Sequence, residues 1–552
     1  MEQLTMTEHI YSKWYHPYEP ADDYKKRVAY FSMEFGIDQA FNIYSGGLGF
    51  LAGSHMRSGY ELKQNMIGIG MLWKYGYYDQ ARNDDHSLRT EFNEKHFEFL
   101  EDTGIEVEVK LHDNPHVKVR AYVLKPEIFG TVPMYFLTTD VDGNDHLSRT
   151  ITNHLYDRNP VTRVSQSIVL GIGGAKVVEA LGGSETYHLN EGHALPAFYY
   201  LRDRGVTKDQ MVFTTHTPEK AGNEEREARH LNRCGFFGRT LSDEELQREM
   251  VNGGMINYTV SALRMAKKAN AVSKLHAVVA NDMWKDYYGT SEIIPITNAQ
   301  NQKFWQDESI KNAWEHRDAG GYKFRKFELK SELCQEVYHQ TGKTFNPNVL
   351  TFVWARRFAA YKRADLLLHD FERFKRLIHN EKYPVQIIWA GKPYPFDYDA
   401  ISVFNHLVYH SKMERNLAVL VGYEIELSRK LKCGSDVWLN TPRITREASG
   451  TSGMTAAMNG SVNVSTNDGW IPEFVKDGDN CFVLPTLDHN LPIWDQDKMD
   501  TNNLYEILEQ KVIPTYYDNP EKWQDIVFTA MDDVIPEFTT QRMADDYYKK
   551  LF

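Results

Sequence analysis

The 552-residue sequence has few cysteines and no excess of basic residues. Its four cysteines lie far apart without paired spacing, so we predict neither a disulfide framework nor a zinc site, and we expect a reducing compartment. The 63 Lys and Arg residues are outnumbered by 76 Asp and Glu residues, which gives a net charge of −13. Because nucleic acids and anionic membranes attract basic surfaces, we expect neither as a partner, and any phosphate site must be local.

Long apolar runs are also absent. No segment reaches the roughly eighteen consecutive apolar residues of a membrane-spanning helix, and residues 1–20 carry charges throughout, unlike a signal peptide. We therefore expect a cytoplasmic protein. Hydrophobic residues make up 42% and charged residues 25% of the chain, which is ordinary for a globular protein, and the length suits two large α/β domains or three smaller ones.

Strand and helix patterns alternate from the start of the chain. Residues 26–37 indicate a buried strand, residues 42–62 a glycine loop entering a helix, and residues 64–73 a second strand. This order predicts a parallel α/β unit. The pattern recurs over residues 164–216, where HLNEGH and THTP follow strand ends, the places where ligand sites of α/β proteins gather.

The domain organisation follows from a change in composition. Residues 301–347 are strongly charged and indicate a helical connection, after which a new α/β series begins. We predict an N-terminal domain over 1–300, a second domain over 348–535 and a C-terminal helix over 536–552. The predicted fold class is α/β, with two doubly wound domains facing a cleft in which a ligand binds.

Two segments could bind anions. In the segment 445–460, Gly450, Thr451, Ser452 and Gly453 can present backbone N–H groups and hydroxyls at a helix start, although a Ser or Thr there is commonly only an N-cap. The second segment places four cations directly after an apolar strand, which favours a phosphate site over a solvated surface helix: Arg356, Arg357, Lys362 and Arg363.

Other polar motifs are weaker signals on their own. The glycines of SGGLGFLAG, Gly46, Gly47 and Gly49, are equally explained by close packing of a helix on a strand. The residues His188, Glu191 and His193 have the spacing of no zinc motif, so we interpret HLNEGH as a metal-free polar loop. His216 of THTP could contact a substrate or be a structural histidine.

Along the chain, eight motifs follow one another in this order: YFSMEFG, IYSGGLG, HLNEGH, THTP, RRFAAYKRADLL, DVWLNTPR, EASGTSGM and FTTQRMADDYYKKLF. Their order and spacing resemble the α-glucan (glycogen, starch and maltodextrin) phosphorylases, especially the short bacterial and archaeal branch, over nearly the whole chain. The resemblance implies two Rossmann-like domains in the GT-B arrangement, with α-1,4-glucan bound in the cleft. It also implies transfer of glucose with retention at the anomeric carbon, and it allows a homodimer, since such relatives are often dimers.

The resemblance also assigns roles by position. It implies that Arg357 and Lys362 hold the substrate phosphate. The glucosyl unit would be held by Glu447, Ser449, Gly450, His216 and Asn298. The pocket for the 5′-phosphate of pyridoxal phosphate would be lined by Gly46, Gly47, Arg356 and Thr451. Tyr423 would contact the ring of this cofactor.

The chain departs from the family at Thr455. The family has at this position the lysine that binds pyridoxal phosphate as a Schiff base, and a threonine hydroxyl has no amine with which to form an imine. A smaller departure is Ala299 in place of a glycine, while Asn298 and Trp305 keep their positions.

Three interpretations remain open from the sequence. The cofactor could bind noncovalently and support phosphorolysis of α-glucan to glucose-1-phosphate. Alternatively, Glu447 and, after seven residues, Thr455 match the spacing of a paired-glutamate motif in nucleotide-sugar transferases, which predicts a glucosyltransferase without pyridoxal phosphate, with Thr455 as a ribose contact. The third is a glucan-binding protein without catalysis, which both phosphate cations argue against.

Overall fold

The computed structural model describes residues 9–111 and 116–552. Its first sheet has nine strands, and the seven from β13 to β7 run parallel to one another, whereas β6 and β5 are antiparallel additions at one edge. In spatial order the strands are β13 (Ile293–Pro295), β12 (Lys268–Ala271), β9 (Met211–Thr214), β8 (Thr186–Asn190), β1 (Val28–Phe31), β2 (Met66–Met71), β7 (Met134–Thr138), β6 (Val117–Leu124) and β5 (Glu101–Val109).

Helices cover the first sheet and share one apolar core with it. They are α1 (Gly47–Glu61), α4 (Pro160–Ile168), α5 (Gly174–Ala180), α6 (Pro196–Asp203), α9 (Tyr258–Met265) and α10 (Lys274–Trp284). The predicted strand, helix, strand unit at the start of the chain is confirmed, because β1 and β2 pair in parallel with Val28 opposite Met66. Every residue of β1 and β2 is buried, as expected for parallel strands covered on both faces.

The second sheet has six strands, all parallel. In spatial order they are β16 (Leu417–Leu420), β15 (Val385–Ala390), β14 (Leu350–Ala355), β17 (Val437–Asn440), β18 (Val462–Ser465) and β19 (Phe482–Val483). The strand order reverses between β14 and β17, and in open α/β sheets ligands bind at the carboxyl ends of the strands beside such a reversal. The predicted cation segment directly follows β14.

Helices also surround the second sheet: α14 (Phe371–Ile378), α15 (Tyr398–Met413), α16 (Ile425–Gly434), α17 (Ser452–Met458), α19 (Ile493–Ile507), α20 (Ile513–Asp518) and α21 (Pro520–Glu537). Residues 301–347 form α11 (Gln302–Trp305), α12 (Glu308–Glu315) and α13 (Ala319–Thr341), as their charged helical pattern predicts. Asp318 caps the start of α13, and Gly342 ends it with a φ of 71°, a conformation that favours glycine.

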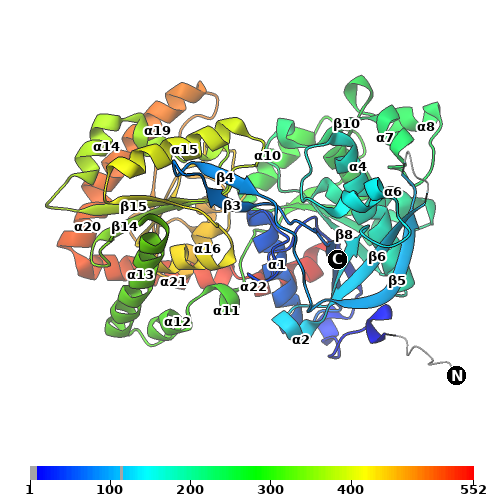
Figure 1. Cartoon of the computed structure of the whole chain (residues 1–552), viewed down its shortest axis with the longest axis horizontal. Coiled ribbons are helices and arrows are strands. Elements are labelled where there is room, and N and C mark those ends of the chain that lie inside the picture. The colour runs from blue at the N-terminus through cyan, green and yellow to red at the C-terminus, as the bar shows by residue number, and fades with distance from the viewer. Residues whose placement is uncertain (1–8, 112–115) are drawn as a thin grey trace.

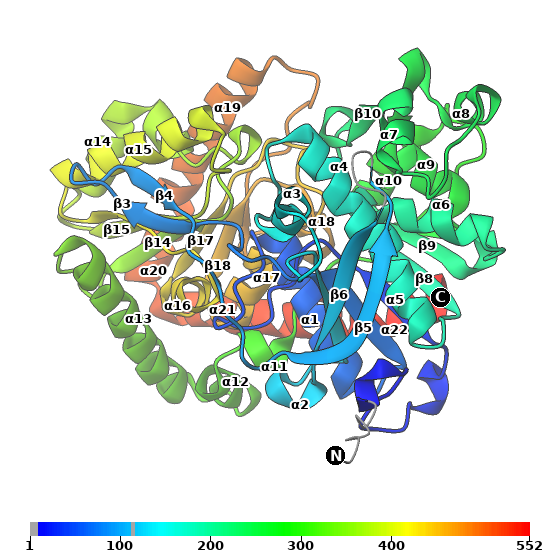
Figure 2. The ribbon, with the colours of Figure 1, turned by 45° about the vertical axis from the view of Figure 1, so that its right-hand side comes forward.

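Two segments cross between the sheets (Figures 1 and 2). The hairpin of β3 (Asp79–Arg82) and β4 (Leu88–Glu91) extends away from the first sheet and lies against α15. There the Leu88 N–H donates to the Asn405 side chain at 2.9 Å. In the other direction, α22 (Thr540–Asp546) packs on α1, and the Tyr24 hydroxyl donates to Asp545 at 2.8 Å. These crossings link the two halves of the chain to each other.

None of the helices within the described ranges combines the length and the apolar character that crossing a membrane requires.

Candidate active site

The carboxyl ends of strands from both sheets meet around the loop that follows β17. The Ser273 hydroxyl, just after β12, donates to the carbonyl of Ala448 at 2.6 Å. Arg446 forms an ion pair with Glu219 of the loop after β9. The predicted anion turn of the second sheet therefore contacts the strand ends of the first, although 175 residues separate Ser273 from Ala448 in the sequence.

Lys362 and Glu447 form an ion pair at the centre of this region. The Lys362 Nζ lies 2.8 Å from a Glu447 carboxylate oxygen, and both side chains are mostly buried. Burial alone would raise the pKa of Glu447, but the charges of Lys362, Arg356 and Arg357 lower it below its usual value. Glu447 is therefore a carboxylate at neutral pH, surrounded by three cations.

Arg357, unlike Lys362 and Arg363, forms no ion pair with any carboxylate of the described chain. Its side chain is exposed to solvent even though protein surrounds it on many sides. Although the surrounding protein opposes the charged form, Tyr361, Tyr77 and Glu447 raise the pKa of Arg357, and Tyr77 belongs to the first half of the chain. The guanidinium is thus a permanently charged donor available to an anion between the two sheets.

Arg356 is buried and holds the end of β17. Its two terminal nitrogens donate to the Asn440 side chain and to the Leu439 carbonyl, the latter at 2.7 Å. Burial lowers the pKa of Arg356, and its Nε has no hydrogen-bond partner within the described residues. A buried N–H donor without an acceptor is costly, so an anion at this nitrogen would satisfy it.

The glycine loop before α1 is organised by Glu34. This buried carboxylate accepts from the N–H groups of Ser45 at 2.6 Å and Gly46 at 3.2 Å, and from the Tyr156 hydroxyl at 2.6 Å. We did not predict this role, although Glu34 is the one acidic residue of YFSMEFG. A glutamate directly after a buried strand could have been the signal.

The three glycines of this loop have different reasons to be glycine. A side chain at Gly49 would meet the Cβ of Tyr44 at 2.6 Å, which confirms close packing at that position. At Gly46 and Gly47 a Cβ would meet nothing within 4 Å, so packing does not explain them. Gly47 is the first residue of α1 and is exposed, which leaves the positive end of a fifteen-residue helix open to an anion.

The turn from 445 to 451 is shaped by two residues in the left-handed region. Thr445 has a φ of 66° and Gly450 a φ of 79°. The Glu447 N–H donates to the buried carboxyl of Asp468 at 2.9 Å, and this hydrogen bond helps to orient the turn. Ser449 is buried, and its hydroxyl donates to the Gly450 carbonyl at 3.2 Å.

Thr451 and Thr455 have different surroundings. Thr451 is the N-cap of α17 but makes no capping hydrogen bond with its side chain, which leaves its hydroxyl for another acceptor. Thr455 is completely buried, and its hydroxyl donates within its own helix, 3.0 Å from the Ser452 carbonyl. Tyr423 is also buried and donates to the Ala355 carbonyl at 3.3 Å.

The histidine and amide predicted for the sugar lie at strand ends of the first sheet. The His216 Nε2 lies 2.7 Å from the Asn190 side-chain oxygen, and burial, followed by the charges of His276 and His193, lowers the pKa of His216 to about 3. His216 is therefore neutral. Asn298 is buried, and its side-chain oxygen has no partner within the described ranges.

The HLNEGH loop is held by internal contacts. The His188 Nε2 lies 2.7 Å from the Thr214 hydroxyl. Glu191 accepts from the His216 N–H at 2.8 Å and from the Thr217 hydroxyl at 3.1 Å. Glu191 thus positions the THTP loop, and these contacts account for its polar character.

Four of the seven non-glycine residues with a positive φ in the described ranges lie in or beside these loops. Tyr156, Glu191, Arg363 and Thr445 have φ values of 59°, 71°, 51° and 66°, which is unusual for side chains with a Cβ. Each such residue costs on the order of 1–3 kcal/mol, and such strain clusters at functional sites. The strain and the convergence of charges mark one region of the molecule.

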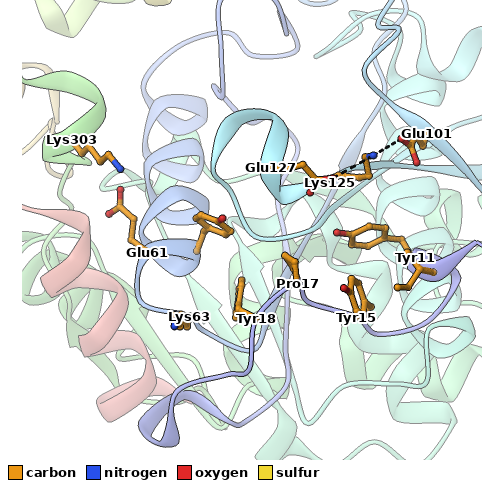
Figure 3. A pocket seen from close by; sticks show the side chains of 12 residues that line it. Tyr11, Tyr15, Pro17, Tyr18, Glu61, Lys63, Glu101, Lys125, Glu127 and Lys303 are labelled. Atoms are coloured by element: carbon orange, nitrogen blue, oxygen red, sulfur yellow. Dashed lines mark ion pairs between the residues drawn. The ribbon is translucent and has the colours of Figure 1, made fainter.

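A separate pocket of about 780 Å³ lies on another surface (Figure 3). It is lined by tyrosines that include Tyr11, Tyr15 and Tyr18, with Lys125 paired to Glu101 at 2.6 Å. None of the residues predicted for the active site lines this pocket. Its volume therefore says nothing about the charged region between the sheets.

Comparison with known proteins agrees with the motifs. The family model described as carbohydrate phosphorylase matches residues 300–507, which include the cation segment and the anion turn. An uncharacterized protein of Methanocaldococcus jannaschii is 44% identical over 96% of this chain and 100% of its own length. The maltodextrin phosphorylase of Thermococcus litoralis is 33% identical over 98% of this chain and 71% of its own.

The glycogen phosphorylase of Mycobacterium tuberculosis is 30% identical, with 95% of this chain and 70% of the relative covered. Identity at this level along almost the entire chain extends well beyond the segment that the family model matches. With eight ordered motifs and relatives of this extent, the chain belongs to the carbohydrate phosphorylase family.

Proposed function

We propose that the protein is an α-glucan phosphorylase that cleaves α-1,4-glucan with inorganic phosphate and releases glucose-1-phosphate. The proposal includes the GT-B arrangement, with the glucan bound in a cleft between the two sheets. The observation that carries it is Arg357, an exposed cation without a carboxylate partner in the described chain, beside the Lys362–Glu447 pair. Arg357 is free to bind an anion, and Lys362 is already held in place by Glu447. Phosphate could therefore bind without a change in the surrounding backbone.

Arg357 and Lys362 would bind the attacking phosphate. The planar guanidinium can donate two hydrogen bonds to one phosphate, and the ammonium supplies a point charge. Glu447 fixes the ammonium at 2.8 Å before the substrate binds. Fixed charges of this kind stabilise the charge that develops in the transition state more than that of the ground state.

The glucosyl unit would be held by neutral groups of both sheets. His216 remains uncharged because burial lowers its pKa to about 3, so it can exchange hydrogen bonds with sugar hydroxyls without competing for the phosphate. The buried Asn298 side-chain oxygen is a ready acceptor, because it has no partner within the described residues. Ser449 and Gly450 would complete this subsite through the turn that Asp468 orients.

The residues present fit the phosphate end of pyridoxal phosphate. Arg356 offers its unpartnered Nε, Thr451 an uncapped hydroxyl, and Gly47 the open start of α1, and together these would hold the 5′-phosphate. When bound, this group supplies a phosphate that can act in acid–base catalysis beside the substrate phosphate. Tyr423 and Gly46 would line the remainder of the pocket.

The nucleotide-sugar interpretation receives less support from the contacts. It requires Thr455 to bind a ribose, but the Thr455 hydroxyl already donates within α17, 3.0 Å from the Ser452 carbonyl. We therefore propose phosphate, rather than a nucleoside diphosphate, as the group exchanged with the glucan.

The proposal is tested by removing the two phosphate-binding cations. Arg357→Ala and Lys362→Ala should each reduce phosphorolysis of maltodextrin by about 10²–10³-fold, because each removes a charge from the developing phosphate. Lys375→Ala is the control, since Lys375 pairs with Glu372 at the surface of α14. Near-normal rates in both site variants, with thermal melting unchanged, would overturn the assignment.

A further inference from the structure

Lys432 is a buried lysine without a conventional partner. It lies on α16 with 1% of its surface exposed, and it makes no hydrogen bond or ion pair within the described chain. Its ammonium sits over the ring of Trp305, 4.0 Å from the ring centroid, and 5.3 Å from that of Phe50. An amine in such a place needs an explanation beyond packing.

Other buried lysines of the protein have acceptors. Lys326 donates to the carbonyls of Cys433 at 2.8 Å and Asn459 at 3.0 Å. Lys330 pairs with Asp436 at 2.6 Å, and Lys392 pairs with Glu424 at 3.1 Å. Lys432 differs from all three, because its nitrogen lies over aromatic rings and has no hydrogen-bond acceptor within the described ranges.

Lys432 lies between α1, which begins at Gly47 of the proposed cofactor pocket, and α11. Phe50 lies on α1, the helix that begins at Gly47, and Trp305 ends α11. The Asn459 side chain donates to the carbonyls of both Trp305 and Thr455, at 2.9 and 2.8 Å. Lys432 thus contacts a tryptophan whose backbone is linked to that of residue 455 through the side chain of Asn459.

The environment also favours the neutral amine. Burial, more than any other cause, lowers the pKa of Lys432 to about 7, and the charges of Arg356 and Arg429 act in the same direction, while Cys433 opposes them. An ordinary lysine is fully protonated at neutral pH and has no lone pair with which to attack a carbonyl. At pH 7, a substantial share of Lys432 is therefore nucleophilic.

We propose that Lys432 supplies the amine that position 455 lacks and forms an imine with the aldehyde of pyridoxal phosphate. This inference rests on the proposed function only for the identity of the cofactor. In the step, the Nζ lone pair attacks the aldehyde carbon, both N–H protons and the carbonyl oxygen leave as one water, and a C=N bond replaces the C=O bond. No oxidant or reductant is needed.

The test is to map the site of attachment. The full chain is incubated with pyridoxal phosphate, reduced with borohydride, digested and analysed by peptide mass spectrometry. The reduced adduct is expected on Lys432 and should disappear in Lys432→Met. It should persist in Lys430→Met, a control on the same helix whose side chain pairs with Glu336 at 2.8 Å.

A double variant shows whether a lost adduct in Lys432→Met reflects loss of the amine or misfolding of the protein. Lys432→Met combined with Thr455→Lys should restore a reducible adduct, now on residue 455. Failure of the wild-type protein to label Lys432, whether the cofactor is retained without an adduct, labels another lysine or does not bind, overturns the inference.

Assaying glucose-1-phosphate in the same preparations separates the two proposals. Labelling of Lys432 without any phosphorolysis would support the inference and contradict the proposed function. Phosphorolysis that depends on added pyridoxal phosphate, without an adduct on Lys432, would support the function and overturn the inference.

Discussion

The ammonium of Lys362 lies 2.8 Å from a carboxylate oxygen of Glu447, and the two residues follow different strands of the second sheet, β14 and β17. The pair spans the reversal of strand order. In the proposed function this pair fixes a cation for phosphate and a carboxylate for sugar hydroxyls in one arrangement, so a change at Glu447 should affect both substrates.

Glu447→Gln keeps the size of the side chain and removes its charge. We expect kcat/KM for maltodextrin to fall about 10–100-fold, because the neutral amide binds both Lys362 and sugar hydroxyls more weakly than a carboxylate. Initial rates at several glucan and phosphate concentrations measure this. A change in melting temperature with unchanged kinetics would instead assign Glu447 a structural role.

The two threonines of the anion turn should respond differently to loss of their hydroxyls. Thr455→Val removes a hydrogen bond inside α17, so it should lower the free energy of unfolding by about 1 kcal/mol. Its turnover should stay within about threefold of the wild-type rate. Thr451→Val removes a hydroxyl free to meet the cofactor phosphate and should weaken binding of pyridoxal phosphate about tenfold. Equilibrium dialysis with the cofactor compares the two variants. Equal losses in both would contradict the different roles inferred for them.

Asp468 should make stability depend on pH. Burial raises the pKa of Asp468 from 3.8 to about 7, so in this interval the folded protein holds a proton that the unfolded chain has lost. The contribution of Asp468 to the free energy of unfolding therefore falls as pH rises from about 4 to about 7, by an amount on the order of a few kcal/mol. Asp468→Asn cannot titrate and should lose this dependence.

Urea unfolding at pH 4.5, 6 and 8 checks the Asp468 prediction. The variant should gain stability relative to the wild type as pH rises. Parallel curves for the two proteins would show that the carboxyl titrates normally in the folded state.

The sequence predicts much of the fold because the signals are local. The apolar run at Val28–Phe31, the glycine loop and the strand at Met66–Met71 each specify their own structure, and parallel pairing follows from their order. The cation segment after β14 and the anion turn before α17 could be recognised in the same way.

The parts that could not be predicted depend on tertiary contacts. Lys430 and Lys432 are two residues apart in one charged helix, and nothing local distinguishes them. Lys430 pairs with Glu336 near the surface, whereas α1 and α11 close over Lys432. Likewise, Asp468 acquires its role only when the turn at Glu447 folds over it.

The most direct test of the account compares donors in one preparation of the wild-type protein. Maltodextrin is incubated with inorganic phosphate, with and without pyridoxal phosphate, and separately with ADP-glucose or UDP-glucose. We predict glucose-1-phosphate in the first reaction, dependent on the cofactor, and no nucleotide release in the second. Release of nucleotide with elongation of the glucan, and no glucose-1-phosphate under any condition, would contradict the account.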